Sequence, residues 1–155
     1  MSSTKKTPIR FRLAGIKTDE FAIIEEALNE QDAATGYSLN TEFGILNHEK
    51  ILCSISFKFL QKTIPFMKIK VSCIFDLEET SWNSLIDLEN SKIILPKDFM
   101  DHIVVLTLGT LRGVLHAKTE GLKFNHYFVP TINVAELSKN VENLSFSIKI
   151  PDNSK

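Results

Sequence analysis

Four segments in the first half of the chain place apolar residues at every second position, the pattern of a strand with one buried face. These segments are 9–13, 39–45, 51–59 and 67–75. Polar turns at 47–50 and 61–65 join the last three in sequence. Such short connections suit antiparallel neighbours, since parallel strands need a long crossover. We therefore expect an antiparallel sheet of four strands or slightly more, paired in chain order as a meander.

The segment 21–28 fits two patterns. Glu25, Glu26 and Ala27 favour a helix, whereas Phe21 and Ile23 could extend a first long strand. We interpret it as strand.

A long helix is predicted over 97–119. Pro96 stands at its entry, Asp98 lies in the first turn and Gly121 follows its end, which are start and stop signals in the expected order. Its apolar residues surround nearly the whole circumference; they are Phe99, Met100, Ile103, Val104, Val105, Leu106, Leu108, Leu111, Val114 and Leu115. The chain is thus expected to form an α+β fold, with the sheet packed on a long helix in the C-terminal half.

One sheet covers only one side of such a helix, so the other side needs a second helix, a long loop or another subunit. Oligomerisation is the simplest cover. Small residues at Gly109, Gly113 and Ala117 would let another backbone approach closely. We predict that the helix contributes five residues to the interface: Met100, Val104, Leu108, Leu111 and Leu115.

Two shorter elements are expected after the long helix. Asn133 is suited to cap a short helix, with Glu136 at its third position reaching back. The segment 144–150 alternates again and predicts a last strand or an extended tail.

Length and charge narrow the class of protein. The 155 residues suit one domain spanning 1–155, with 1–8 and 151–155 as flexible ends. A net charge of −1 argues against nucleic acid or an anionic membrane as partner. No apolar run approaches the roughly 20 residues of a membrane span. Because the N-terminus also lacks a signal-peptide pattern, we expect a cytoplasmic protein.

Catalytic and metal-binding patterns are absent from the sequence. It has no phosphate-binding glycine loop, no nucleophile elbow and no zinc-protease motif. His102 and His116 would stand about 21 Å apart on the predicted helix, too far to share a metal. Cys53 and Cys73 fall on the apolar face of their strands, where a thiol acts as a small hydrophobe. We expect no enzyme activity, no cofactor and no metal.

The order of these elements resembles the SecB family of protein-export chaperones. The resemblance rests on Pro96 at the helix entry, the Arg112-Gly113 pair, Pro130 in the following loop, and a short helix from Asn133 to Leu137. It implies a subunit of a dimer or a dimer of dimers that holds unfolded or nascent polypeptides in apolar grooves without ATP. The near-zero charge departs from the acidic character with which the family engages the motor protein SecA, so the resemblance leaves SecA open as a partner.

Candidate client-binding residues are apolar side chains in loops or off the regular core face, of which we expect about half to be core. They are Phe43, Leu46, Phe66, Ile74, Trp82, Phe124, Tyr127 and Phe128. Two alternatives stay open: a SecB-like chaperone dedicated to one partner such as an antitoxin, and a non-enzymatic interaction module on the same fold.

Overall fold

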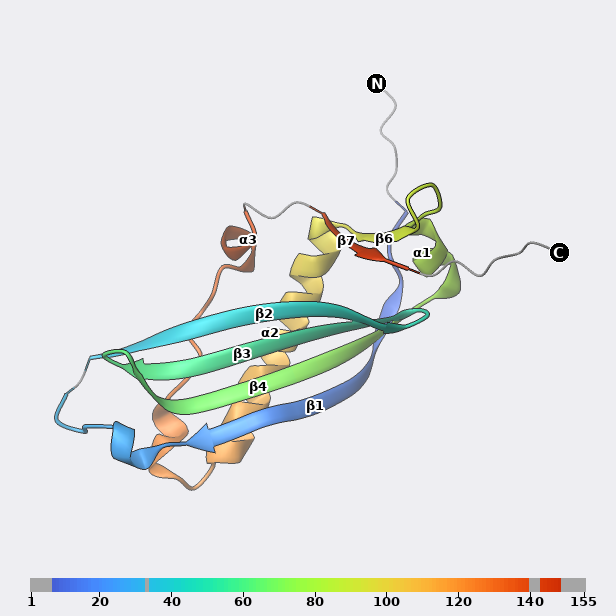
Figure 1. Ribbon diagram of the computed structural model, residues 1–155. Coiled ribbons are helices and arrows are strands. Elements are labelled where there is room, and N and C mark those ends of the chain that lie inside the picture. The colour runs from blue at the N-terminus through green and yellow to red at the C-terminus, as the bar shows by residue number, and fades with distance from the viewer. Residues whose placement is uncertain (1–6, 33, 140–142, 149–155) are drawn as a thin grey trace.

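Two antiparallel sheets and one long helix form the framework of the protein (Figure 1). The computed structural model describes residues 7–32, 34–139 and 143–148, so most of the predicted flexible ends lies outside the described residues. The strands are β1 (Phe11–Ile23), β2 (Thr35–Asn47), β3 (Lys50–Gln61), β4 (Ile64–Leu77), β5 (Ile86–Asp87), β6 (Lys92–Leu95) and β7 (Leu144–Ser147). The helices are η1 (Glu25–Ala27), α1 (Glu79–Ser84), α2 (Lys97–Thr119), η2 (Lys123–His126) and α3 (Val134–Leu137). The predicted α+β class, with an antiparallel sheet packed on a long helix, is confirmed.

The main sheet has the order β1-β4-β3-β2, which corrects the expected meander. Strands β2, β3 and β4 do pair in chain order through the two predicted turns. Strand β1, however, pairs with β4 and not with β2: Phe11 lies opposite Leu77 and Phe21 opposite Ile69. This register places the apolar residues of both strands on the same face of the sheet, so burial decides the pairing against sequence proximity.

The connection from β1 to β2 therefore passes along one end of the sheet. Gln61, which is buried at the end of β3, anchors it: its amide nitrogen donates to the carbonyls of Asn29 and Asp32, and its Oε1 accepts from the Asn29 N–H. The segment 21–28 is strand only as far as Ile23, after which η1 begins. The strand interpretation is right for 21–23 and wrong for Glu25–Ala27.

Helix α2 has the predicted bounds and packs diagonally across one face of the sheet (Figure 1). Its buried residues recur every three or four positions and meet the apolar face of β3 and β4. All five residues predicted for the subunit interface belong to this buried side, with Leu111 wholly inaccessible. That prediction is corrected: Met100, Val104, Leu108, Leu111 and Leu115 form the core between α2 and the sheet.

The second sheet, β5-β6-β7, lies near the start of α2 and was only partly expected. The alternating segment 144–150 does form a strand, β7, which pairs with β6 so that Phe146 lies opposite Ile93. Residues 149 and 150 lie outside the described part. Strands β5 and β6 and helix α1 are too short to give a periodic signal in the sequence.

Candidate functional site

An apolar groove of about 170 Å³ lies between the edge strand β2 and the helices α2 and α3. Phe43 enters it from β2, Met100 and Val104 from α2, and Val134 and Leu137 from α3. Thr41, Asp101 and Ser138 complete the lining. Phe43 is half-buried and Leu137 is 56% exposed, so the groove presents apolar surface that a ligand can reach.

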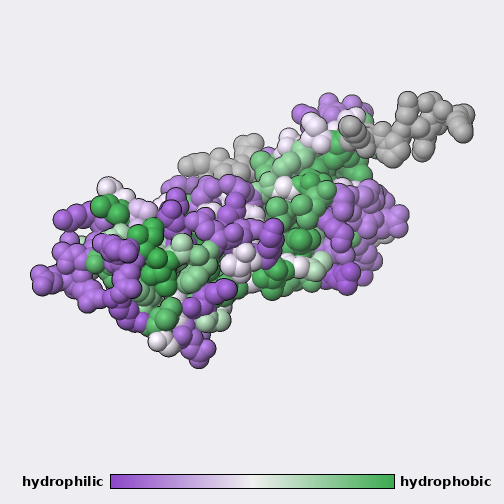
Figure 2. All heavy atoms as spheres, turned by 60° about the horizontal axis from the view of Figure 1, so that its bottom comes forward, coloured by the Kyte–Doolittle hydropathy of each residue, from purple (hydrophilic) through white to green (hydrophobic). Residues whose placement is uncertain are grey.

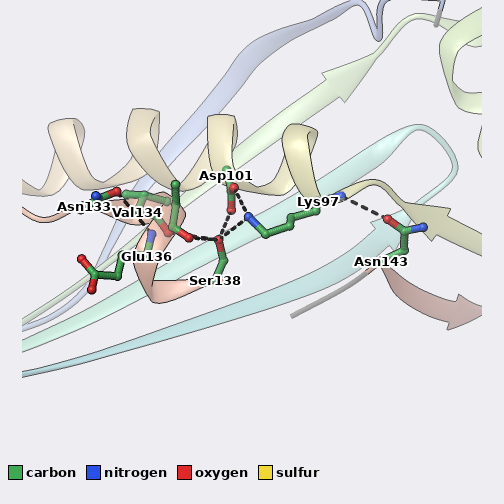
Figure 3. Close-up of polar contacts among 8 residues, drawn as sticks. Lys97, Asp101, Asn133, Val134, Glu136, Ser138 and Asn143 are labelled. Carbon is green, nitrogen blue, oxygen red and sulfur yellow. Dashed lines mark hydrogen bonds and ion pairs between the residues drawn. The ribbon is translucent and has the colours of Figure 1, made fainter. Parts of the chain in front are cut away.

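Polar contacts hold α3 against α2 and so shape one wall of the groove (Figure 3). The Lys97 ammonium donates to Asp101 Oδ2 at 2.7 Å and to the Ser138 hydroxyl at 2.9 Å. Ser138 Oγ in turn lies 2.6 Å from Asp101 Oδ1. Partial burial raises the pKa of the Asp101 carboxyl, but the hydrogen bonds from Lys97 and Ser138 and the charge of Lys97 outweigh it and lower that pKa below its usual value.

The predicted Asn133 N-cap of α3 forms, whereas the described residues show no hydrogen bond from the Glu136 side chain back to it. The side chain of Asn133 accepts a hydrogen bond from the Glu136 N–H at 3.3 Å, the geometry of an N-cap. Arg112 of α2 donates to the carbonyl oxygen of Pro130 at 2.8 Å and fixes the segment that leads into α3. Pro96 is the N-cap residue of α2, and Gly113 has open space where a Cβ would stand. Among the motif residues, Arg112, Pro130 and Asn133 therefore position the wall of the groove that α3 forms.

The backbone edge of β2 beside this groove is unprotected. From Thr35 to Ile45 the strand pairs with β3 without a register break, and Thr35–Asn47 contains neither lysine nor proline. The opposite edge strand, β1, has register shifts at Leu13/Gly15 and Thr18/Glu20, and it carries Lys17 between them. Bulges and lysines are the usual means by which proteins block edge-to-edge pairing. Over Thr35–Ile45, β2 has neither, so this stretch is the edge open to another strand.

The predicted client-binding residues occupy very different environments. Phe66, Trp82 and Phe124 are buried in the core of the chain. Tyr127 is half-buried against the rings of Phe59 and Phe66, with centroids 5.8 and 4.9 Å away.

The remaining predicted client-binding residues are more accessible. Leu46 is 49% and Phe128 is 67% exposed. Ile74 lies half-buried on the opposite face of the sheet, against Gly15. Among the eight, only Phe43 lines the groove.

A second apolar surface lies on the other side of α2, next to β1. Leu106 follows His102 by one turn, and the His102 ring contacts Phe11 of β1 at 5.4 Å. Val105 and Leu106 are 51% and 39% exposed, and on β1 Leu13 and Ile16 are 47% and 54% exposed. Figure 2 shows hydrophobic residues gathered in a band across the middle of this side of the molecule, between polar ends. We call these four residues the α2–β1 surface.

The sequence indicated Leu137 only as a motif residue, and Val105 and Leu106 only as part of a helix that is apolar all round; Val134 and the part of the α2–β1 surface on β1 were not predicted. A helical wheel could have indicated the surface, since at about 100° per residue Val105 lies about 160° from Ile103 and Leu106 about 140° from Leu111. The groove depends on the docking of α3 by Ser138, for which the sequence carries no pattern.

The described residues offer little that resembles an enzyme centre. No cluster of three or more His, Cys, Asp or Glu side chains that could hold a metal occurs in 7–32, 34–139 and 143–148. Burial raises the pKa of the Cys53 thiol to about 12, so it stays protonated and unreactive. Within the same residues, no helix is long and apolar enough to cross a membrane.

No protein-family model matches the chain, and no curated protein matches its sequence. Among solved structures, the chain is similar to a SecB-like chaperone from Mycobacterium tuberculosis, determined in complex with a ChAD peptide from an antitoxin. The identity is 11% and the TM-score 0.47, over 79% of this chain and 91% of that one.

Proposed function

We propose that this protein is a chaperone that binds unfolded polypeptides and holds them without ATP. The observation that carries the proposal is the unprotected edge of β2 beside the groove lined by Phe43, Val134 and Leu137. An unfolded chain exposes unpaired backbone and apolar side chains together, and this site offers a partner for both.

The binding mode follows from strand geometry. A client segment in extended conformation adds to β2, so its main-chain N–H and C=O groups pair with those of the edge without regard to sequence. Every second client side chain then points to the face of the sheet that carries α2, where the groove accepts apolar groups. Binding of the unfolded but not the folded state lowers the concentration of free unfolded chains and so suppresses aggregation.

The α2–β1 surface supports a homo-oligomer, either a dimer or a dimer of dimers. Four apolar side chains on this surface are substantially exposed in the single chain, so they contribute little hydrophobic stabilisation there; they are Leu13, Ile16, Val105 and Leu106. Gly109 and Gly113 have open space where a Cβ would stand. A second copy that packs here buries the apolar side chains and approaches the helix closely at the glycines.

Light scattering of a chemically unfolded protein diluted into buffer tests the proposal. The wild-type chain should suppress aggregation at near-stoichiometric ratio. A matched pair of variants locates the activity: Leu137→Ser removes an exposed groove residue, and Leu88→Ser removes a leucine that is 70% exposed but lies outside the groove. Suppression should weaken in the first and persist in the second. An oligomer of confirmed fold that leaves aggregation unchanged contradicts a holdase.

Narrower roles are distinguished by what the protein captures in cells. A mixture of many non-native proteins in a pull-down indicates a general chaperone, and recovery of SecA with them indicates a link to export. A single stoichiometric protein, such as an antitoxin, indicates a dedicated chaperone.

A further inference from the structure

No described helix or strand covers the face of the main sheet that points away from α2 (Figure 1). We call it the outer face. Its side chains form rows across the four strands, because residues opposite one another in an antiparallel register share a face. One row contains Lys17, Ser72, Ser54 and Glu42, and the next but one contains Ala22, Lys68, Lys58 and Ser38.

Most charges on the outer face are neutralised by a neighbour within the face. Lysine or arginine nitrogens lie 2.9 to 3.6 Å from carboxylate oxygens in the pairs Lys17–Asp19, Lys70–Glu42, Arg12–Asp76 and Lys50–Asp76. The Arg12 hydrogen bond, together with Lys50, holds the pKa of the Asp76 carboxyl below its usual value. In this part of the face, each of these charged side chains therefore has a partner of opposite charge.

Lys58 and Lys68 are different. They lie directly opposite each other on β3 and β4, and their row neighbours are Ala22 and Ser38. Lys62 stands exposed in the turn that follows β3. Among the described residues, no carboxylate oxygen lies within ion-pair distance of these three ammonium groups. Like charges placed opposite each other on a sheet destabilise it, and no ion pair among the described residues offsets this repulsion; the carboxylate in the neighbouring row is Glu20, opposite Lys70.

We propose that Lys58 and Lys68 form a docking site for an acidic, extended polypeptide segment of a partner protein. Glutamate or aspartate side chains of that segment neutralise the lysine row and relieve its repulsion, while the Ser38 and Ser56 hydroxyls beside it donate hydrogen bonds to carboxylates. Single-stranded nucleic acid is the less suited anion, because the rows around Lys58 hold Ala22, Ser38, Ser56 and Asn40 and so give no aromatic ring for bases to stack on. The site lies on the face opposite the groove, so both can be occupied at once.

Fluorescence anisotropy of a labelled peptide tests the site. The peptide alternates Glu and Ser over about twelve residues, a length that matches the strands at about 3.3 Å per residue. Its control replaces Glu by Gln. The wild-type chain should bind the Glu peptide, bind the Gln peptide at least about tenfold more weakly, and lose affinity as salt rises. Lys58→Gln/Lys68→Gln should weaken binding by a similar factor, whereas Lys92→Gln/Lys118→Gln, with the same loss of charge elsewhere, should not.

The charge-reversed variant Lys58→Glu/Lys68→Glu should prefer a Lys-Ser peptide, which keeps the test decisive if one variant folds poorly. Equal affinity for the Glu and Gln peptides overturns the proposal, as does an equal loss in the control pair. Binding of an oligothymidine through Lys58 and Lys68 without binding of the Glu peptide also overturns it. The aggregation assay is independent of these lysines, so failure here leaves the chaperone proposal untouched.

Discussion

The guanidinium of Arg112 donates a hydrogen bond of 2.8 Å to the carbonyl oxygen of Pro130, across 18 residues of chain. This contact ties the segment after η2 to the side of α2 and aims it toward α3. Both residues belong to the motif that suggested SecB, and the structure gives them a physical role. They place α3, and with it one wall of the groove.

Replacing Arg112 by Ala should destabilise the protein by about 1–2 kcal/mol, since a charged donor to a partly buried carbonyl is lost. Urea unfolding measures the change. Lys118→Ala, an exposed position on the same helix, should stay within about 0.5 kcal/mol of the wild type. Equal effects in the two variants would mean that the contact contributes nothing beyond helix propensity.

The docking of α3 should weaken in acid. Because the pKa of Asp101 is lower in the folded than in the unfolded chain, its contribution to stability is present above the ordinary value near 4 and disappears as the pH falls through the folded value. The protection factors of the amides in 134–138, taken against intrinsic exchange at each pH, should therefore fall below about pH 4. Asp101→Asn cannot titrate and should flatten this pH dependence; an unchanged profile would assign it to other carboxyls.

Lys58→Gln should stabilise the chain by about 0.2–1 kcal/mol, because it removes the repulsion with Lys68 across β3 and β4. Thermal or urea unfolding at low salt measures the gain, which should shrink as salt screens the charges. Lys92→Gln provides the matched loss of a lysine elsewhere. A gain of the same size there would point to net charge and away from the cross-strand pair.

Substitutions of Gly113 can distinguish an effect on helix stability from an effect on contact between subunits. Ala and Gln both favour helix over Gly, by up to about 1 kcal/mol, and the open space at this position admits either in the isolated subunit. Gly113→Ala should keep the oligomer, whereas the longer side chain of Gly113→Gln should weaken it. Light scattering coupled to size-exclusion chromatography reports the mass. A monomeric wild type, or an oligomer indifferent to Gln, contradicts a contact at this helix face.

Local signals determined which parts of the fold could be predicted. Helix α2 was located to its exact ends because Pro96 and Gly121 mark them, and β3 and β4 were found because Cys53 and Cys73 sit in long alternating runs. The pairing of β1 with β4 was missed because it depends on contacts distant in sequence. The chain brings Phe11 next to Leu77, a choice that no neighbouring residue reveals.

The candidate site was harder to predict than the fold. The sequence pattern of an apolar residue such as Leu111 is the same whether the residue packs on the sheet or on another subunit. Core residues were therefore predicted to form an interface. Phe66 and Phe124 were taken for client contacts for the same reason. The type of a side chain indicates that it is buried but does not indicate what buries it. Only the packing of α2 on β3 and β4 distinguishes a core residue from a residue that contacts a client or a second subunit.

Hydrogen–deuterium exchange of β2, with and without a saturating unfolded client, tests the central claim most directly. If a client strand adds to the open edge, the outward amides between Thr35 and Ile45 should gain protection, and the edge of β1 should not. Protection that spares β2 and appears only on β1 or the outer face would contradict a client site at this edge.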